Sequence, residues 1–178
     1  MKRIILSAIF IMAIVVSANA QDYKWFIGGQ AGYVTGKSGN TRTTAITVAP
    51  EVGFRFSKDF AFASSFGYTH LTTKVGNNKA KSNGFIIGPY LRYTFLKKGI
   101  VGAFVDGGAK FGLSDVKGFE AGLRPGISID LTNRLSVVAS LGFVGYNDGK
   151  NIGRNKYGKG FEVDFSGNQS SFGFYFSI

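Results

Sequence analysis

The sequence predicts an all-β protein, a closed eight-stranded antiparallel up-and-down β-barrel that spans a membrane. The first observation is that bulky apolar residues alternate with small or polar ones along almost all of the chain after residue 20. The second is composition, because 26 Gly, 18 Phe and 8 Tyr among 178 residues favour strands over helices. The third is that short turns alternate with longer polar links, which is typical of transmembrane barrels.

The first twenty residues predict an export signal rather than part of the barrel. Lys2 and Arg3 precede an apolar stretch over 4–16, and Ala18-Asn19-Ala20 follows as a cleavage site. The alternative, a membrane anchor, is disfavoured because the stretch is shorter than the ~20 residues of a spanning helix. We therefore expect a signal peptide over 1–20 and a barrel domain over 21–178. The absence of Cys excludes disulfides and cysteine metal sites.

Eight segments of the remaining chain have the period of a strand. Side chains of a strand point alternately to its two faces, so each segment has one bulky apolar face and one small or polar face. Ile86 and Phe104 depart from this alternation. In the segment 135–146 we place Phe143 on the apolar face and Tyr146 on the polar face. The segments are 25–33, 46–56, 60–69, 85–95, 101–111, 119–131, 135–146 and 171–178.

The connections between these segments fall into two length classes. Tight turns are predicted at Ser57-Lys58-Asp59, Lys97-Lys98-Gly99 and Thr132-Asn133-Arg134. Longer polar links are predicted over 36–42, 74–83, 114–118 and 147–167. Residues 161–165 alternate with the opposite parity to 172–178, so either Ser166-Gly167-Asn168 forms a bulge or 161–165 pairs with an extension of the seventh strand. The sequence leaves both alternatives open.

All three prolines lie at one place in the pattern. Pro50, Pro89 and Pro125 each begin a Pro-x-Φ-x-Φ-x-Φ run, where Φ is apolar, that leads into a short turn. Proline has no N–H to donate to a ladder, and a closed barrel has no edge strand on which to place it. We therefore predict that each proline marks a bulge or a local break in pairing.

The volume of the two faces decides which of them points outward. An eight-stranded barrel has an interior just wide enough for side chains to fill, so the bulky face must face lipid and the small face must line the lumen. Charges on the inner face should pair, because an unpaired charge there lacks solvent. We predict an interior ion-pair network that fills the lumen and has a packing role. It comprises Glu51, Arg55, Arg92, Asp106, Lys110, Glu120, Arg124 and Asp130, four charges of each sign.

The signal peptide, the eight alternating segments and the terminal Ser171-Phe-Gly-Phe-Tyr-Phe-Ser-Ile178 resemble the small outer-membrane β-barrel family of Gram-negative bacteria, whose members include the OmpA transmembrane domain. The resemblance implies an outer-membrane location and an assembly signal in the last strand, read by the barrel-assembly machinery. It would comprise Phe172, Phe174, Phe176 and Ile178, with Ile in place of the common terminal Phe. Functions in the family range from anchoring and adhesion to lipid modification, so the resemblance implies no single activity.

The charge pattern favours a non-enzymatic barrel with a structural or surface-interaction role. The formal net charge is +11, and most of the excess lies in the predicted links. Such links would attract lipopolysaccharide phosphates or acidic glycans, although simple solubility explains them equally well. We expect a monomer in outer-membrane lipid, without a cofactor or nucleic acid. The basic link residues are Lys37, Arg42, Lys74, Lys79, Lys81, Lys150, Arg154, Lys156 and Lys159.

Two alternatives remain within the same fold, a lipid-A-modifying enzyme and a narrow channel. The single His70 shares a face with Ser64, but six residues of strand separate them by about 20 Å, which exceeds hydrogen-bond reach. Barrel enzymes that remove acyl chains from lipid A place His and Ser two residues apart, and Thr72 occupies the matching position here. We therefore expect no catalytic site.

Overall fold

The protein is an antiparallel β-barrel in the computed structural model, which describes residues 25–76, 78–114, 117–148, 159–165 and 170–178. The predicted signal peptide lies outside these residues. No helix in the described part of the chain is long and apolar enough to cross a membrane. The strands are β1 (Trp25–Ser38), β2 (Thr41–Arg55), β3 (Phe60–Val75), β4 (Asn78–Lys98), β5 (Val101–Ser114), β6 (Gly118–Asp130), β7 (Leu135–Ser140), β8 (Phe143–Asn147), β9 (Gly160–Asp164) and β10 (Ser171–Ser177).

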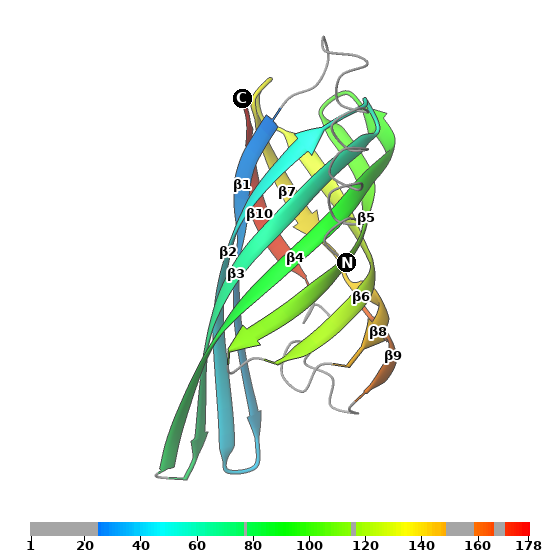
Figure 1. Ribbon diagram of the computed structural model, residues 1–178. Helices are drawn as coiled ribbons and strands as arrows, with labels where there is room; N and C mark the ends of the chain where they lie inside the picture. The colour runs from blue at the N-terminus through cyan, green and yellow to red at the C-terminus, as the bar shows by residue number, and fades with distance from the viewer. Residues whose placement is uncertain (1–24, 77, 115–116, 149–158, 166–169) are drawn as a thin grey trace.

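These strands occupy eight positions in a closed wall (Figure 1). β1 to β6 each pair with the next strand along the chain, and β1 also pairs with β10, which closes the ring through β7. β7 and β8 follow each other along one side of β6, so together they form the seventh position. β9 and β10 form the eighth, because β9 pairs with β8 and β10 pairs with β7. The predicted fold class is confirmed.

The small residues face the lumen and the bulky apolar residues face outward. Along β3 the exposed fractions alternate from Ala61 (5%) and Phe62 (39%) to Ala63 (1%), and Phe66 is again 48% exposed. The buried interior contains the aromatic residues Phe26, Phe104 and Tyr175 beside Ala61, Ala63 and Val138. A soluble barrel would bury its bulky face, so this arrangement has the polarity of a transmembrane barrel.

The outward apolar residues form a belt of even height. They run over 46–54 on β2, 60–68 on β3 and 85–95 on β4, which are 9, 9 and 11 residues. A transmembrane β-strand needs about 9–11 residues. Aromatic pairs lie at the edge of this belt nearest the chain's C-terminus, including Trp25 with Phe54 and Phe60 with Tyr93. We call the end with Trp25 and Ile178 the turn end, because the tight turns lie there.

Two of the tight turns are stabilised in the same way. Ser57 Oγ accepts hydrogen bonds from the N–H groups of Asp59 and Phe60, and Thr132 Oγ1 accepts them from Arg134 and Leu135. The third turn begins two positions later than predicted. Lys97 and Lys98 belong to β4 and pair with Gly102 and Val101, so the turn is Gly99-Ile100, where Gly99 has a φ of 59°.

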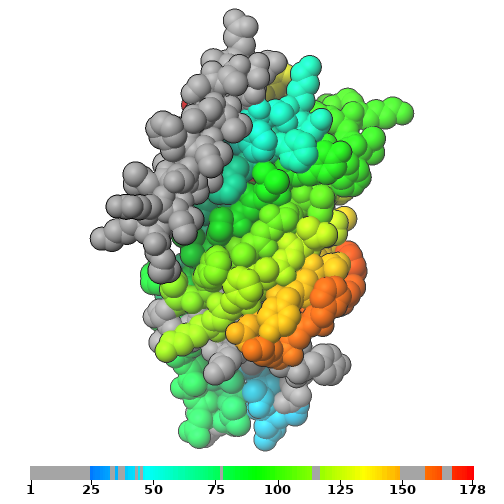
Figure 2. All heavy atoms as spheres, turned by 45° about the vertical axis from the view of Figure 1, so that its right-hand side comes forward, coloured from blue at the N-terminus to red at the C-terminus, as the bar shows by residue number. Residues whose placement is uncertain are grey.

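The predicted links over 36–42 and 74–83 are paired strands, contrary to expectation. β1 and β2 pair up to Ser38 and Thr41, and β3 and β4 pair up to Val75 and Asn78. Gly39 and Gly76 supply the positive φ values of 56° and 57° at the two hairpin tips. The two hairpins therefore continue beyond the rest of the barrel as a four-stranded projecting sheet, which we define as 35–44 and 70–83 (Figures 1 and 2).

Each proline interrupts the pairing of its strand with the next one, as predicted. β2 and β3 pair on both sides of Pro50 but not at 49–50, and β4 and β5 pair on both sides of Pro89 but not at 88–89. At Pro125 the register of β6 also shifts by one residue between Gly126–Ser140 and Leu123–Val144, which is a β-bulge. Each proline keeps its partner on the other side.

The bulge at Leu141–Gly142 reverses the predicted faces beyond it. Phe143 is completely buried and Tyr146 is 39% exposed, so both predicted orientations were wrong. The extra residue changes the parity of the strand, and the sequence pattern alone did not mark it. Phe104, which departed from the alternation, lies inside the barrel with 1% exposure.

The structure decides between the two alternatives for the segment 161–165. Residues 160–164 form β9 and pair with β8, so the second alternative, pairing with an extension of the seventh strand, is correct. The predicted bulge at 166–168 lies outside the described residues.

Candidate functional site

The lumen carries the polar groups that the alternation predicted for it. Arg92 on β4 pairs with Asp106 on the neighbouring β5 through two hydrogen bonds, from Nε and from Nη2, both of 2.7 Å. Its guanidinium also lies over the Phe104 ring, 3.8 Å from the centroid. The side chains of Arg92 and Asp106 are 12% and 8% exposed, so water screens this pair weakly.

Glu51 is held by hydroxyl groups instead of a cation. Tyr90 Oη donates to Glu51 Oε2 over 2.7 Å, and Tyr175 Oη donates to the same oxygen. No described cation lies within ion-pair distance of Glu51, so the expectation of a charged partner was wrong for this residue. Tyr90 and Tyr175 were not predicted site residues, although both lie on the inner face by strand parity.

A second charge cluster lies between β5 and β6. Glu120 forms ion pairs with Arg124 on its own strand and with Lys110 opposite it, the latter at 3.5 Å. Arg124 also lies over the ring of Phe143, 4.6 Å from its centroid. The buried Phe143 thus packs against this cluster, a contact that depends on the bulge described above.

The remaining two predicted charges lie near the turn end and do not pair with each other. Asp130 accepts a 2.7 Å hydrogen bond from Ser136 Oγ and forms a 3.0 Å ion pair with Lys97, which the sequence analysis had placed in a turn. Arg55 forms no ion pair with any described residue. The predicted eight-residue network is therefore divided into local groups.

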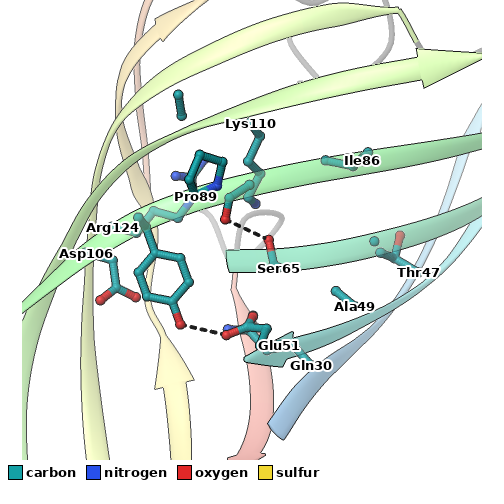
Figure 3. A pocket seen from close by; sticks show the side chains of 14 residues that line it. Gln30, Thr47, Ala49, Glu51, Ser65, Ile86, Pro89, Asp106, Lys110 and Arg124 are labelled. Carbon is teal, nitrogen blue, oxygen red and sulfur yellow. Dashed lines mark hydrogen bonds between the residues drawn. The ribbon is translucent and has the colours of Figure 1, made fainter. Parts of the chain in front are cut away.

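Two cavities in the lumen lie on either side of one layer of side chains. One, of about 80 Å³, is lined by Glu51, Asp106, Lys110 and Arg124, which converge on it from β2, β5 and β6 (Figure 3). The other, of about 390 Å³, opens toward the turn end. Between them lie Glu51, Tyr90, Arg92, Asp106, Phe104 and Tyr175, which we call the lumen layer.

The basic residues of the projecting sheet form a cross-strand row. Arg42 is directly opposite Lys74, and Lys74 is directly opposite Lys79. Lys37 is opposite Arg42 in the ladder, but its side chain lies outside the described set. Two residues closer to the belt, Thr44 is opposite Thr72, and Thr72 is opposite Lys81. A cavity of about 110 Å³ is lined by Arg42, Thr44, Thr72 and Lys74.

The parity of the strands places this row on the outward side of the wall. Arg42 and Lys74 share their faces with the belt residues Ile46 and Tyr68, respectively. This cationic row, Arg42, Lys74 and Lys79, therefore lies next to the apolar belt, on the side away from the turn end. Like charges directly opposite each other destabilise a ladder, so this row favours an anionic counterpart.

The other predicted basic residues contribute less to the described surface. Lys150, Arg154 and Lys156 lie outside the described residues. Lys159 forms a 3.4 Å ion pair with Asp148, whose carboxylate raises the pKa of Lys159. The proposed assembly-signal residues Phe172, Phe174, Phe176 and Ile178 are 66%, 61%, 44% and 67% exposed, as outward side chains are.

His70 has two polar partners at the edge of the belt next to the projecting sheet. Its Nδ1 lies 2.6 Å from Asn83 Oδ1, and its Nε2 lies 3.3 Å from Thr72 Oγ1. Ser64 lies on the same face but closer to the turn end, opposite Val52 and Pro89. No group of three metal-ligating His, Cys, Asp or Glu side chains occurs in the part of the chain that the structure describes.

No family model and no curated protein matches this chain. Among solved structures, the translocator domain of the autotransporter NalP from Neisseria meningitidis matches with a TM-score of 0.36 and 11% identity. The match covers 92% of this chain and 65% of that one, so the chain spans less than two thirds of its length. The fold assignment rests on the strand pairing described above.

Proposed function

We propose that the protein is an integral outer-membrane barrel with a closed lumen, whose function is carried by its outer surface. The belt supports a membrane location, because its height matches a transmembrane strand on each of the strands compared above. The predicted export signal and the resemblance to small outer-membrane barrels favour the outer membrane. The turn end would then face the periplasm, with the projecting sheet outside.

The lumen layer supports a role other than transport. A channel needs hydrated, separated charges, whereas here Arg92 is held by Asp106 and Glu51 by two tyrosines. We expect purified protein to show no steady single-channel conductance in planar bilayers. Regular conductance steps would support the channel alternative instead.

The cationic row carries the functional proposal. A lipid of the outer leaflet would place its acyl chains against the belt and its phosphates at the level of Arg42, Lys74 and Lys79. Thr44 and Thr72 add hydroxyl donors in the same cavity. We therefore propose that the projecting sheet binds the phosphates of lipopolysaccharide, with acidic glycans as the competing ligand class.

The test compares lipopolysaccharide binding by the wild type and by a triple variant, Arg42→Gln, Lys74→Gln and Lys79→Gln. We expect the triple variant to bind at least tenfold more weakly and with less dependence on salt, since exposed charges are screened over about 8 Å at physiological ionic strength. Lys98→Gln, an exposed change near the opposite end, is the matched control. Equal binding by the triple variant and the wild type would refute this proposal, and stronger binding of acidic glycan would favour the competing class.

The contacts of His70 favour a second candidate function, ester hydrolysis at the lipid surface. If His70 Nδ1–H donates a hydrogen bond to Asn83 Oδ1, then the unprotonated Nε2 can act as the base that takes the proton of the Thr72 hydroxyl. The Thr72 oxygen would then attack an acyl carbonyl, His70 would return the proton to the leaving alcohol, and water would release the acid.

Mass spectrometry of lipid A and phospholipids after incubation with the folded protein tests this candidate. Acyl release that is lost in both His70→Gln and Thr72→Val, but retained in Ser64→Ala, would establish it. Unchanged lipid in the presence of the wild type would exclude it.

A further inference from the structure

The larger lumen cavity forms a vestibule at the turn end. Its volume is about 390 Å³, and its floor is the lumen layer, represented by Arg92, Phe104 and Tyr175. Lys58 and Asp59 of the first tight turn also line it, and both are exposed to solvent. The vestibule is therefore open to molecules that approach this end, and its volume falls within the ~300–1,000 Å³ of typical small-molecule sites.

Arg55 is the one strand-borne cation of this vestibule that forms no ion pair with a described carboxylate. It is the last residue of β2, lies on the inner face and is half-buried. The other two strand-borne cations of the lining are paired, Arg92 with Asp106 and Lys97 with Asp130. The Asp130 carboxylate attracts Arg55 from beyond ion-pair distance, but its oxygens are engaged by Lys97 and Ser136.

The rest of the lining also favours an anion. Arg92 is neutralised by Asp106, and the remaining lining has three cations, Arg55, Lys58 and Lys97, and two acids, Asp59 and Asp130. Hydroxyl groups of Thr94, Ser128 and Ser177 add further hydrogen-bond donors. A half-buried guanidinium without a partner attracts anions more strongly than an exposed one, because water screens it less.

We propose that the vestibule binds a small oxyanion, a carboxylate or phosphate group, with Arg55 as its principal ligand. The planar guanidinium donates two parallel hydrogen bonds to such a group, and the hydroxyls of the lining bind its other oxygens. The bound anion supplies the direct ion pair that Arg55 does not form with Asp130. This site is separate from the projecting sheet and independent of the function proposed for it.

Isothermal titration calorimetry of the refolded barrel tests this site, with inorganic phosphate and succinate as probes at constant ionic strength. We expect saturable binding of at least one probe, and at least tenfold weaker binding by Arg55→Gln. Arg55→Lys keeps the charge but not the fork of donors, so its affinity should lie between the two. Arg42→Gln on the projecting sheet should retain the binding event that Arg55→Gln loses.

Amide chemical shifts of the wild type provide a measurement that needs no variant. Phosphate or succinate should shift the resonances around Arg55, Ser57 and Ser128, and any shift around Thr72 belongs to the separate site on the projecting sheet. Absence of saturable binding of both probes, or equal binding by Arg55→Gln, would overturn the proposal. Shifts confined to the projecting sheet would also overturn the proposal. A preference for one of the two probes would identify phosphate or carboxylate as the group that the vestibule binds.

Discussion

At the scale of the residue, the interior is stabilised by a few contacts that each satisfy a buried charge. Arg92 shows the pattern, since its guanidinium lies over the Phe104 ring and donates two hydrogen bonds to the Asp106 carboxylate. Removing one partner of a buried pair leaves the other charge uncompensated, which costs more than removing both. The lumen layer should therefore respond sharply to single substitutions.

Arg92→Met should lower the free energy of unfolding by about 3–5 kcal/mol, because it leaves Asp106 buried without its cation. Asp106→Leu in the same chain should recover most of this loss. Urea unfolding in lipid vesicles, followed by tryptophan fluorescence, measures both. Equal stability of Arg92→Met and the wild type would show that water reaches Asp106 freely.

Two glycines provide a matched test of interior packing. A Cβ at Gly53 would lie 2.1 Å from the Phe26 ring and 2.7 Å from Ala63 Cβ, whereas a Cβ at Gly32 would meet nothing within 4 Å. We expect Gly53→Ala to destabilise the barrel by about 1–3 kcal/mol through overpacking. Gly32→Ala should be neutral or slightly stabilising. Similar unfolding midpoints for the two variants would contradict the packing described here.

The inner-face charges could be assigned from parity alone, since parity depends only on position in a strand. Their partners could not, because pairing depends on register and on hydroxyl groups that carry no charge signal. Glu51 shows this, as Tyr90 and Tyr175 approach it from β4 and β10. The orientation of Phe143 could not be predicted either, because one bulge residue that the pattern did not mark switches the following side chains of the strand to the other side of the wall.

At the scale of the element, the strands are longer than the membrane requires. β4 has 21 residues, about twice the span of a transmembrane strand. Its apolar outward run stops at Phe85, and polar residues continue the ladder to Asn78. The sequence pattern predicted loops there because the alternation of apolar residues ends where the strand leaves the lipid. The backbone pairing of the strands continues beyond that point. The breaks at the prolines were predictable, since they follow from the missing N–H alone.

Shortening the β3–β4 hairpin tests whether the projecting sheet is needed for folding of the barrel or only for ligand binding. Replacing 72–81 by Asn-Gly would keep Leu71 opposite Ser82 and close the hairpin with a two-residue turn. We expect the barrel to fold with a nearly unchanged unfolding midpoint, and lipopolysaccharide binding to fall as in the triple variant. The heat-dependent shift in electrophoretic mobility reports folding. A shortened protein that fails to fold would show that the projecting sheet is part of the stable core.

At the scale of the whole molecule, the barrel has an apolar outer surface around a polar lumen. Leu91 lies near the middle of the belt and Leu96 lies at its turn-end edge, and both are exposed. Leu91→Arg should cost about 2–4 kcal/mol of unfolding free energy, and Leu96→Arg about 0–1 kcal/mol, because the penalty depends on depth in the bilayer. Equal costs, measured by urea unfolding in vesicles, would mean that the belt does not set the membrane position.

The most direct test of the account is the environment of the outward face of β3. The chain contains no Cys, so single nitroxide labels can be introduced at Phe62, Phe66 and Lys74. In bilayers, labels at Phe62 and Phe66 should be accessible to oxygen but not to a water-soluble nickel chelate, and the label at Lys74 should show the reverse. Free access of the nickel chelate to Phe62 and Phe66 would contradict the assignment of this face to lipid.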